Sequence, residues 1–248
     1  MSKSSAPAVF LSALMALSAL PAAASAPPSS PVVVELFTAQ GCTACPDANR
    51  SVARLGQERD IVVLTYNVDY WDYLGWQDTY ARPEFVQRQR AYRQALGQRS
   101  LATPQVVIAG HENLDPSRES DLHQKVLSVA TPDISPPDIE FRETGDRVGI
   151  GSGRVPEGGA EVVAVRYSPG MHNVTVRTGD NRGRSVSHMN VVRAIYPLGD
   201  WNGRSSLYEL PPAARANGSG RDAVIVLLQS KTTRQIIASA MMPELRPD

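Results

Sequence analysis

The stretch Val32–Cys45, VVVELFTAQGCTAC, joins a nearly continuous apolar run to two cysteines that are three positions apart. β-Branched, aliphatic and aromatic side chains in such a run are typical of a strand buried on both faces, as in a parallel sheet. Gln40-Gly41 ends the run, and we expect the following turn to open a helix. Unpaired N–H groups at a helix start favour a thiolate at Cys42. With a second thiol one turn away, this pattern predicts a dithiol redox site.

The cysteine count and the composition set limits on the fold and on the partners. Two cysteines in 248 residues cannot build a stabilising disulfide framework, so a hydrophobic core must stabilise the chain. The length allows two domains. The 25 basic residues balance the 25 acidic ones, and this balance does not favour nucleic acid or an anionic membrane as a partner.

Residues 1–24 have the pattern of a secretory signal peptide, with Lys3 followed by an apolar segment at 8–20 and by small residues up to Ala24. The apolar segment is too short to span a bilayer as a mature helix, so we expect no stable membrane insertion after cleavage. We expect the mature protein to be periplasmic or secreted. In an oxidising compartment, a cysteine pair can cycle or rest as a disulfide.

Helix and strand patterns alternate after the cysteines. A strand–helix–strand connection makes its two strands parallel, so the end of the second strand should lie beside the cysteines. The expected elements are a helix at 46–55, a buried strand at 61–66, a helix at 83–96, a strand at 106–108 after Thr103-Pro104, and a helix near 116–129 with Asp115 as its cap.

Aromatic residues are concentrated just after the second strand. Six of the 15 aromatic residues lie between Tyr66 and Tyr80, where the topology places them around the dithiol. Tyr70, Trp71 and Trp76 are therefore candidates for binding an extended partner chain. The alternative is that Trp71 and Trp76 pack a domain interface or cap the sheet. No histidine stands near the aspartates of this segment to complete a metal site.

The order of these elements resembles that of the thioredoxin superfamily. In finer detail, the sequence looks like the secreted thioredoxin-like family catalogued as domain of unknown function number 1223, over nearly the whole mature chain. The segments that carry this likeness are VVVELFTAQGCTACPDA (32–48), NVDYWDYLGWQD (67–78), QRQRAY (87–92) and TPQVVIAG (103–110).

The resemblance implies roles for individual residues. Cys42 would be the nucleophile, Cys45 the resolving thiol, and Pro104 a cis proline with Thr103 before it. Glu35 would be the buried acid that exchanges a proton with the resolving thiol. Glu35 lies seven residues before Cys42, one more than is expected of thioredoxin itself, so an equal alternative is a strand residue paired with an arginine.

A proline-rich linker at 131–137 precedes a change of pattern. Eight short β runs separated by turns predict an antiparallel β-sandwich over 138–248. The expected fold is therefore an α/β thioredoxin-like domain at 25–130 followed by a mainly antiparallel β-sandwich domain. Residues 178–184 are interpreted as a hairpin turn.

Two histidine–methionine pairs, Met171-His172 and His188-Met189, lie in the second half. Imidazole and thioether ligands suit copper. Adjacent residues on a strand point to opposite faces, however, so neither pair can easily hold one ion. We interpret both pairs as surface histidines beside core methionines.

These patterns favour an exported thiol-disulfide oxidoreductase. Cys42 and Cys45 would exchange disulfides with the thiols or disulfides of partner proteins, without a bound cofactor, and a membrane redox partner is a further candidate. The Thr43-Ala44 dipeptide leaves the redox direction open. The alternatives are a copper carrier that uses the two thiolates, and a non-catalytic adaptor with a resting Cys42–Cys45 disulfide.

Overall fold

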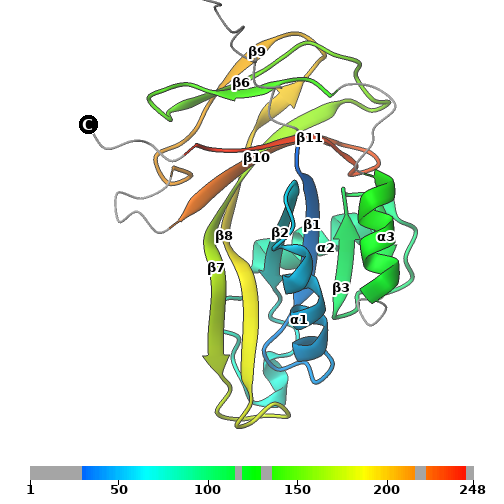
Figure 1. Ribbon diagram of the computed structural model, residues 1–248, viewed down its shortest axis with the longest axis vertical. Coiled ribbons are helices and arrows are strands. Elements are labelled where there is room, and N and C mark those ends of the chain that lie inside the picture. Colours follow the sequence, from blue (N-terminus) through cyan, green and yellow to red (C-terminus); the bar gives the residue numbers. More distant parts are fainter. Residues whose placement is uncertain (1–29, 115–118, 130–135, 216–221, 244–248) are drawn as a thin grey trace, which may run out of the picture.

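The computed structural model describes residues 30–114, 119–129, 136–215 and 222–243. It has a mixed α/β fold with one large, mostly antiparallel sheet (Figure 1). The expected signal peptide, the expected cap Asp115 and most of the expected linker lie outside these residues. The elements are β1 (Val32–Thr38), α1 (Cys45–Leu55), β2 (Ile61–Asn67), the 3-10 helix η1 (Asp72–Leu74), α2 (Pro83–Ala95), β3 (Gln105–Ile108), β4 (Glu112–Leu114), α3 (Glu119–Val129), β5 (Ile139–Phe141), β6 (Arg147–Ile150), β7 (Ala160–Thr175), β8 (Ser185–Trp201), β9 (Ser206–Glu209), β10 (Ala223–Ser230) and β11 (Ile236–Met241).

The large sheet has eight strands in the order β11-β10-β7-β8-β2-β1-β3-β4. Strand β1 runs parallel to β2, which confirms the expected orientation, and antiparallel to β3. One further pairing was not expected. Strand β8 runs parallel to β2, with Val191 opposite Thr65. Strands of the second half therefore extend the first sheet.

The second sheet is small, with three strands in the order β5-β6-β9. Val148 and Ile150 of β6 pack against Val162 of β7 and Val226 of β10. Apolar side chains thus fill the space between two layers of mostly antiparallel strands, as in a sandwich. One of these layers belongs to the large sheet, however, so only the smaller layer consists solely of strands after residue 137. Periodicity identifies strands in a sequence, but it does not reveal which sheet they join.

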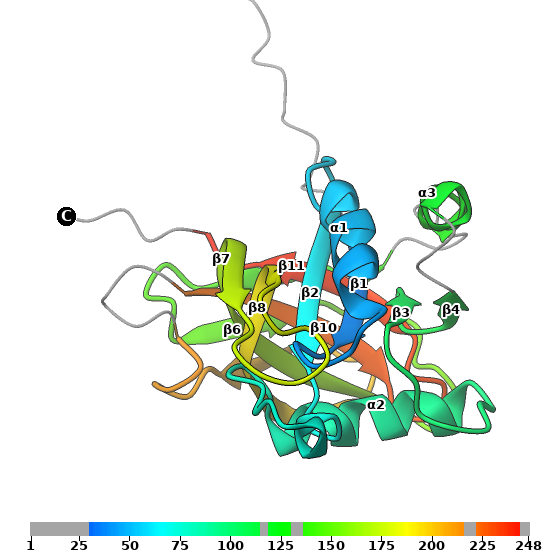
Figure 2. The same cartoon turned by 90° about the horizontal axis from the view of Figure 1, so that it is seen from below.

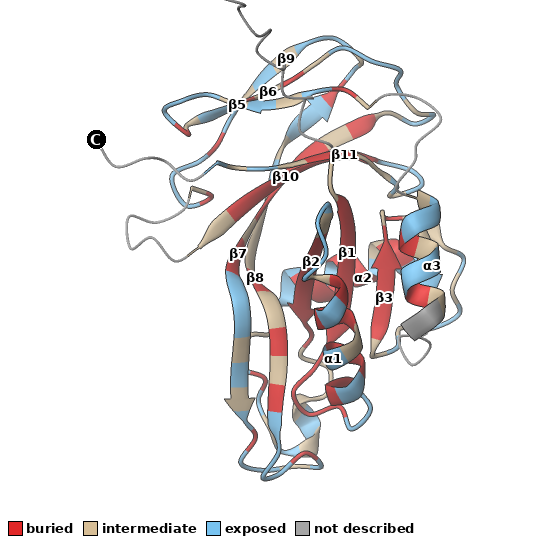
Figure 3. Ribbon diagram, in the orientation of Figure 1, coloured by how far each residue is buried: buried red, intermediate tan, exposed pale blue. Residues whose placement is uncertain are grey.

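Helices cover both faces of the sheet around β1. Helices α1 and α3 lie on one face and α2 lies on the other (Figure 2). Val34 and Leu36 pack with Val52 of α1, whereas Val33 and Phe37 belong to the cluster that contains the α2 side chains. Every residue of β1 is consequently buried, as expected for this strand (Figure 3). No helix in the described ranges is long and apolar enough to cross a membrane.

Strands β7 and β8 form a long hairpin that runs alongside α1 (Figure 1). Two of the eight expected β runs, 161–167 and 173–178, are separated in the sequence by a segment with Pro169-Gly170. In the structure, β7 continues through this segment. The structure accommodates these residues as an irregularity in the strand pairing, with Gly170 at φ +83° and its N–H bonded to Asn190. The loop that joins the two strands, residues 176–184, is here named the hairpin tip. It confirms the expected turn and reaches the cysteines.

Candidate functional site

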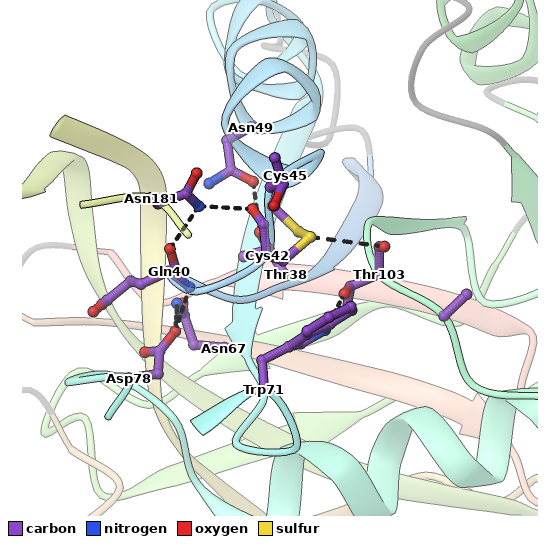
Figure 4. The surroundings of a disulfide bond; sticks show 12 residues. Thr38, Gln40, Cys42, Cys45, Asn49, Asn67, Trp71, Asp78, Thr103 and Asn181 are labelled. Carbon is purple, nitrogen blue, oxygen red and sulfur yellow. Dashed lines mark hydrogen bonds between the residues drawn. A yellow bond between two sulfur atoms is a disulfide. The ribbon is translucent and has the colours of Figure 1, made fainter. Parts of the chain in front are cut away.

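Cys42 and Cys45 form a disulfide beyond the carboxyl end of β1 (Figure 4). We expected Cys42 to lie in the first turn of the helix. Helix α1 begins at Cys45, however, so Cys42 lies in the turn before it. Pro46 explains the difference, because it has no N–H to donate to the Cys42 carbonyl in the helical pattern. That carbonyl accepts hydrogen bonds from the Cys45 N–H, at 3.2 Å, and from Asn181, at 2.8 Å.

The loop before β3 reaches the disulfide from the opposite side to Asn181 (Figure 4). The peptide bond between Thr103 and Pro104 is cis, in agreement with the geometry that the resemblance implies. The Thr103 carbonyl oxygen lies 3.8 Å from Cys42 Sγ, and the Thr103 hydroxyl accepts a hydrogen bond of 2.6 Å from the Trp71 indole. The structure therefore brings together five of the predicted site residues from distant parts of the chain: Cys42, Cys45, Trp71, Thr103 and Pro104.

The disulfide is largely covered. Cys42 is 2% exposed and Cys45 is fully buried, whereas Thr43 and Ala44 between them are exposed. Beside the turn lies a hollow of about 910 Å³, whose lining includes Ala44, Asp47, Gln98, Pro104 and Asn113. Of the two cysteines, Cys42 is therefore the less completely buried.

The aromatic segment contributes to the site mainly from inside. Tyr70, Trp71 and Trp76 are half-buried, and each donates a hydrogen bond within the protein: Tyr70 to Gln89, Trp71 to Thr103, and Trp76 to Gln40. These contacts fit the packing alternative. Tyr73, which the sequence did not single out, is 78% exposed and presents its ring to solvent.

The turn before Cys42 rests on a buried carboxylate, Asp78. The Gln40 N–H and the Asn67 amide both donate to Oδ2 of Asp78, at 2.7 and 3.0 Å. Burial raises the pKa of Asp78, although these hydrogen bonds oppose the shift. Sequence analysis did not identify Asn67 and Asp78 as site residues. Both belong to the segment 67–78, which carries the family resemblance, and this membership could have drawn attention to them.

The hairpin tip covers another side of the cysteine turn. Asn181 is buried, and its amide group donates to the carbonyl oxygens of both Gln40 and Cys42, at 2.9 and 2.8 Å. Arg184 donates to the Asn181 side-chain oxygen at 3.0 Å and approaches the Thr43 carbonyl at 3.5 Å. Nothing in the sequence connected these two residues with the dithiol, because about 140 positions separate them from it.

Glu35 is fully buried, and α2 supplies its partners. The Arg88 guanidinium binds both carboxylate oxygens, at 2.6 and 3.0 Å, and the Tyr92 hydroxyl donates to one of them. This arrangement matches the arginine-paired alternative for Glu35. Its role in proton exchange with Cys45 stays a prediction.

The histidines of the second half do not lie as expected. His188 is fully buried, with its ring 5.6 Å from that of Tyr80, while Met171 is 48% exposed. The pairing of β7 with β8 explains this, because His172 lies opposite His188 and Met171 lies opposite Met189. One face of the hairpin therefore carries both histidines. Among the described residues, no group of three or more His, Cys, Asp or Glu side chains is placed to hold a metal ion.

The burial of His188 predicts a pH-dependent stability. Burial lowers the pKa of His188 from 6.5 to about 4. Between these pH values the unfolded chain binds more protons than the folded one, so this contribution to the free energy of unfolding decreases as the pH falls through that window. The loss reaches about 3 kcal/mol. We expect His188→Gln to flatten the pH dependence in urea unfolding measured between about pH 4.5 and 7.5. Equal slopes for variant and wild type would contradict this prediction.

The chain is similar to one family model and to solved structures of other proteins. A family model described as "Protein of unknown function (DUF1223)" matches residues 33–229. The X-ray structure of protein AGR_C_4864 from Agrobacterium tumefaciens is 29% identical, and the alignment covers 90% of this chain and 99% of that chain with a TM-score of 0.69. HBP35 of Porphyromonas gingivalis is 17% identical, with coverage of 86% and 75% and a TM-score of 0.58, which is a likeness of fold alone. No curated protein matches the chain.

Proposed function

The chain belongs to the family described as "Protein of unknown function (DUF1223)", and we propose from its site that it is a thiol-disulfide oxidoreductase acting on partner proteins. The observation that carries this proposal is the position of the disulfide. Cys42 Sγ lies 3.8 Å from the carbonyl of the residue before a cis proline. Cys42 belongs to the turn that precedes a helix, and a hollow lies beside this turn. Disulfide exchange requires a sulfur that a partner thiolate can reach, and Cys42 is the less completely buried of the two cysteines.

The arrangement of the first half supports a thioredoxin-like unit within the mixed fold. Its strands have the order β2-β1-β3-β4, with β1 and β2 parallel and the other neighbours antiparallel. Helices cover both faces of these strands, and the cysteine turn joins β1 to α1. We extend the proposal to the second half as a sandwich-like unit whose larger layer is continuous with the first sheet.

The proposed exchange proceeds through a mixed disulfide. A partner thiolate attacks Cys42 Sγ, the bond to Cys45 breaks, and its electron pair passes to Cys45 Sγ, which takes up a proton. A second partner thiolate then attacks the partner sulfur of the mixed disulfide, and Cys42 leaves as a thiolate. The partner loses two electrons and the cysteine pair gains them. The reverse sequence reduces a partner disulfide, and neither direction needs a bound cofactor.

The surroundings of Cys42 fit an extended partner chain. A proline has no backbone N–H, and the carbonyl of Thr103 before it points toward Cys42, so the backbone at this position can pair with a partner segment. The hollow beside Ala44 and Pro104 offers such a segment room. A larger hollow of about 1230 Å³ lies at the other end of β2, between Ile61 and Met241, and it contains no cysteine.

We place this activity in the periplasm or outside the cell. The support is the signal-peptide pattern of residues 1–24, because an exported protein meets oxidising conditions and cysteine-containing substrates. Protein thiols and disulfides are the proposed partners. A membrane redox protein that restores the cysteine pair after each exchange is a further proposed partner.

The reduction potential of the cysteine pair tests the proposal. The purified mature protein is equilibrated in graded glutathione buffers, and its alkylated thiols are counted by mass. We expect a reversible potential between about −120 and −270 mV, the range of thioredoxin-like catalysts. The burial of both cysteines favours a second candidate, an adaptor with a resting disulfide. A disulfide still closed below about −300 mV would support that adaptor and contradict the oxidoreductase.

A further inference from the structure

We infer that the hairpin tip is a working part of the dithiol site, in which Asn181 and Arg184 position the cysteine turn and favour the thiolate form of Cys42. The inference rests on the proposed exchange activity and assigns a role to the second half of the chain.

Asn181 replaces a hydrogen bond that the sequence of the turn makes impossible. In a regular helix the N–H of residue 46 would donate to the carbonyl of Cys42, but residue 46 is a proline. The Asn181 amide donates to that carbonyl and also to the Gln40 carbonyl, and its oxygen accepts from Arg184. Both of its N–H groups and its oxygen are thus in use, as a buried amide requires.

These contacts involve the backbone of the turn and neither of the sulfur atoms. Reduction of the disulfide therefore leaves the Asn181 hydrogen bonds available. The turn can therefore hold Cys42 in its place before α1 when the covalent link to Cys45 is gone. A free loop would instead lose conformational entropy each time that the site is assembled for reaction. Asn181 is in this sense a positioning residue.

Arg184 adds a positive charge at the same place. Its guanidinium lies 3.5 Å from the Thr43 carbonyl, between the two cysteines in sequence, and the bond to Asn181 orients it. A nearby cation favours a thiolate over a thiol. Asp47 is paired with Arg50, and buried Asp78 accepts the Gln40 N–H. Asp180 of the hairpin tip itself is an exposed carboxylate. The Arg184 side chain is exposed, so salt should weaken its effect.

A more stable thiolate has two measurable consequences. The pKa of the Cys42 thiol falls, and the reduced form of the pair gains stability relative to the disulfide. The hairpin tip would then make the protein a stronger oxidant than the cysteine turn alone.

The test compares three single variants of the mature protein. Arg184→Gln removes the charge, Arg184→Lys keeps it, and Arg182→Gln removes an exposed charge from the same hairpin tip as a matched control. The Cys42 pKa is measured on chemically reduced protein, from the pH dependence of the alkylation rate with peptide mass mapping. The equilibrium with glutathione is measured in parallel.

We expect Arg184→Gln to raise the Cys42 pKa by about half a unit to one unit. The equilibrium should shift about three- to tenfold toward the disulfide, which is about 15 to 30 mV for a two-electron couple. Arg184→Lys should retain most of the wild-type values, Arg182→Gln should match wild type, and about 1 M salt should reduce the difference.

A double variant tests whether Asn181 acts through Arg184. Asn181→Ala with Arg184→Gln should shift the Cys42 pKa no further than the larger of the two single changes, because both remove the same oriented charge. A residue that only stabilised the fold would change unfolding and leave the thiol pKa unchanged.

The inference is overturned if Arg184→Gln leaves the Cys42 pKa and the glutathione equilibrium at their wild-type values, or if Arg182→Gln shifts them equally. The pKa is measured after chemical reduction, so it reports on the inference even for a disulfide that exchanges slowly. Absence of a reversible potential in the wild type would instead count against the proposed function.

Discussion

Cys42→Ser is expected to reduce disulfide exchange to the rate of a mixture without the protein. Cys45→Ser is expected to retain the attack of the free Cys42 thiolate on a partner disulfide and to trap the resulting mixed disulfide. The difference follows from the positions of the two cysteines, because Cys42 is 2% exposed and lies next to Thr103, whereas Cys45 is fully buried. Without Cys45, a mixed disulfide at Cys42 lacks the neighbouring thiol that resolves it. Non-reducing electrophoresis and mass spectrometry of partners bound to each variant would measure both outcomes.

A matched control separates the chemistry from the fold. Thr43→Ser changes an exposed residue inside the same turn and should leave exchange intact. A disulfide that encloses two residues restricts the unfolded chain little, so the serine variants should unfold at nearly the wild-type urea concentration. If the protein with both cysteines replaced by serine still exchanged disulfides at the wild-type rate, the proposed function would be wrong.

The first half of the fold was predictable because its signals are local. The apolar residues of β1 and the break at Gln40-Gly41 are contiguous in sequence, and the strand–helix–strand connection fixes β1 and β2 as parallel. The role of Thr103-Pro104 beside Cys42 followed from a resemblance, and the antiparallel pairing of β3 with β1 brings the two together in the structure. In each case, a short segment and one topological rule were sufficient.

The contribution of the second half was not predictable by the same route. Asn181 reaches Cys42 only because β8 pairs with β2 and the hairpin runs alongside α1, where Asn49 donates to the Ser187 carbonyl. Strand periodicity carries no information on such long-range pairing. His188 is buried and Met171 is exposed, the reverse of what we expected. The reason is again a long-range pairing, because the face that each residue occupies depends on the register of β7 against β8.

Glu35 illustrates a different limit of sequence analysis. Its place on a buried strand was evident, but the identity of its partner depends on how α2 packs across the sheet. Arg88 provides that partner, and its guanidinium also donates to Gln229 of β10 at 3.2 Å. Gln229 in turn donates to the Tyr92 hydroxyl at 2.9 Å. The carboxylate therefore belongs to a buried polar network that connects the first half of the chain to the second.

Glu35→Gln is expected to lower the free energy of unfolding by about 3 to 5 kcal/mol, as for other broken buried ion pairs. The variant leaves the buried Arg88 guanidinium without a counter-charge. Urea unfolding at neutral pH measures the loss. Asp200→Asn is the matched control, because it breaks the exposed pair with Lys231 and should cost less than about 1 kcal/mol.

The same variant separates the two interpretations of Glu35. If the carboxylate stabilises the fold alone, Glu35→Gln lowers stability while the reduction potential of the cysteine pair and the pH profile of exchange stay near wild type. If it exchanges a proton with Cys45, resolution of mixed disulfides slows and its pH profile changes. A combined Glu35→Gln and Arg88→Met variant should recover part of the lost stability, because no unpaired charge then remains buried. Failure to recover any would show that the packing of this network, rather than its charge balance, determines the stability.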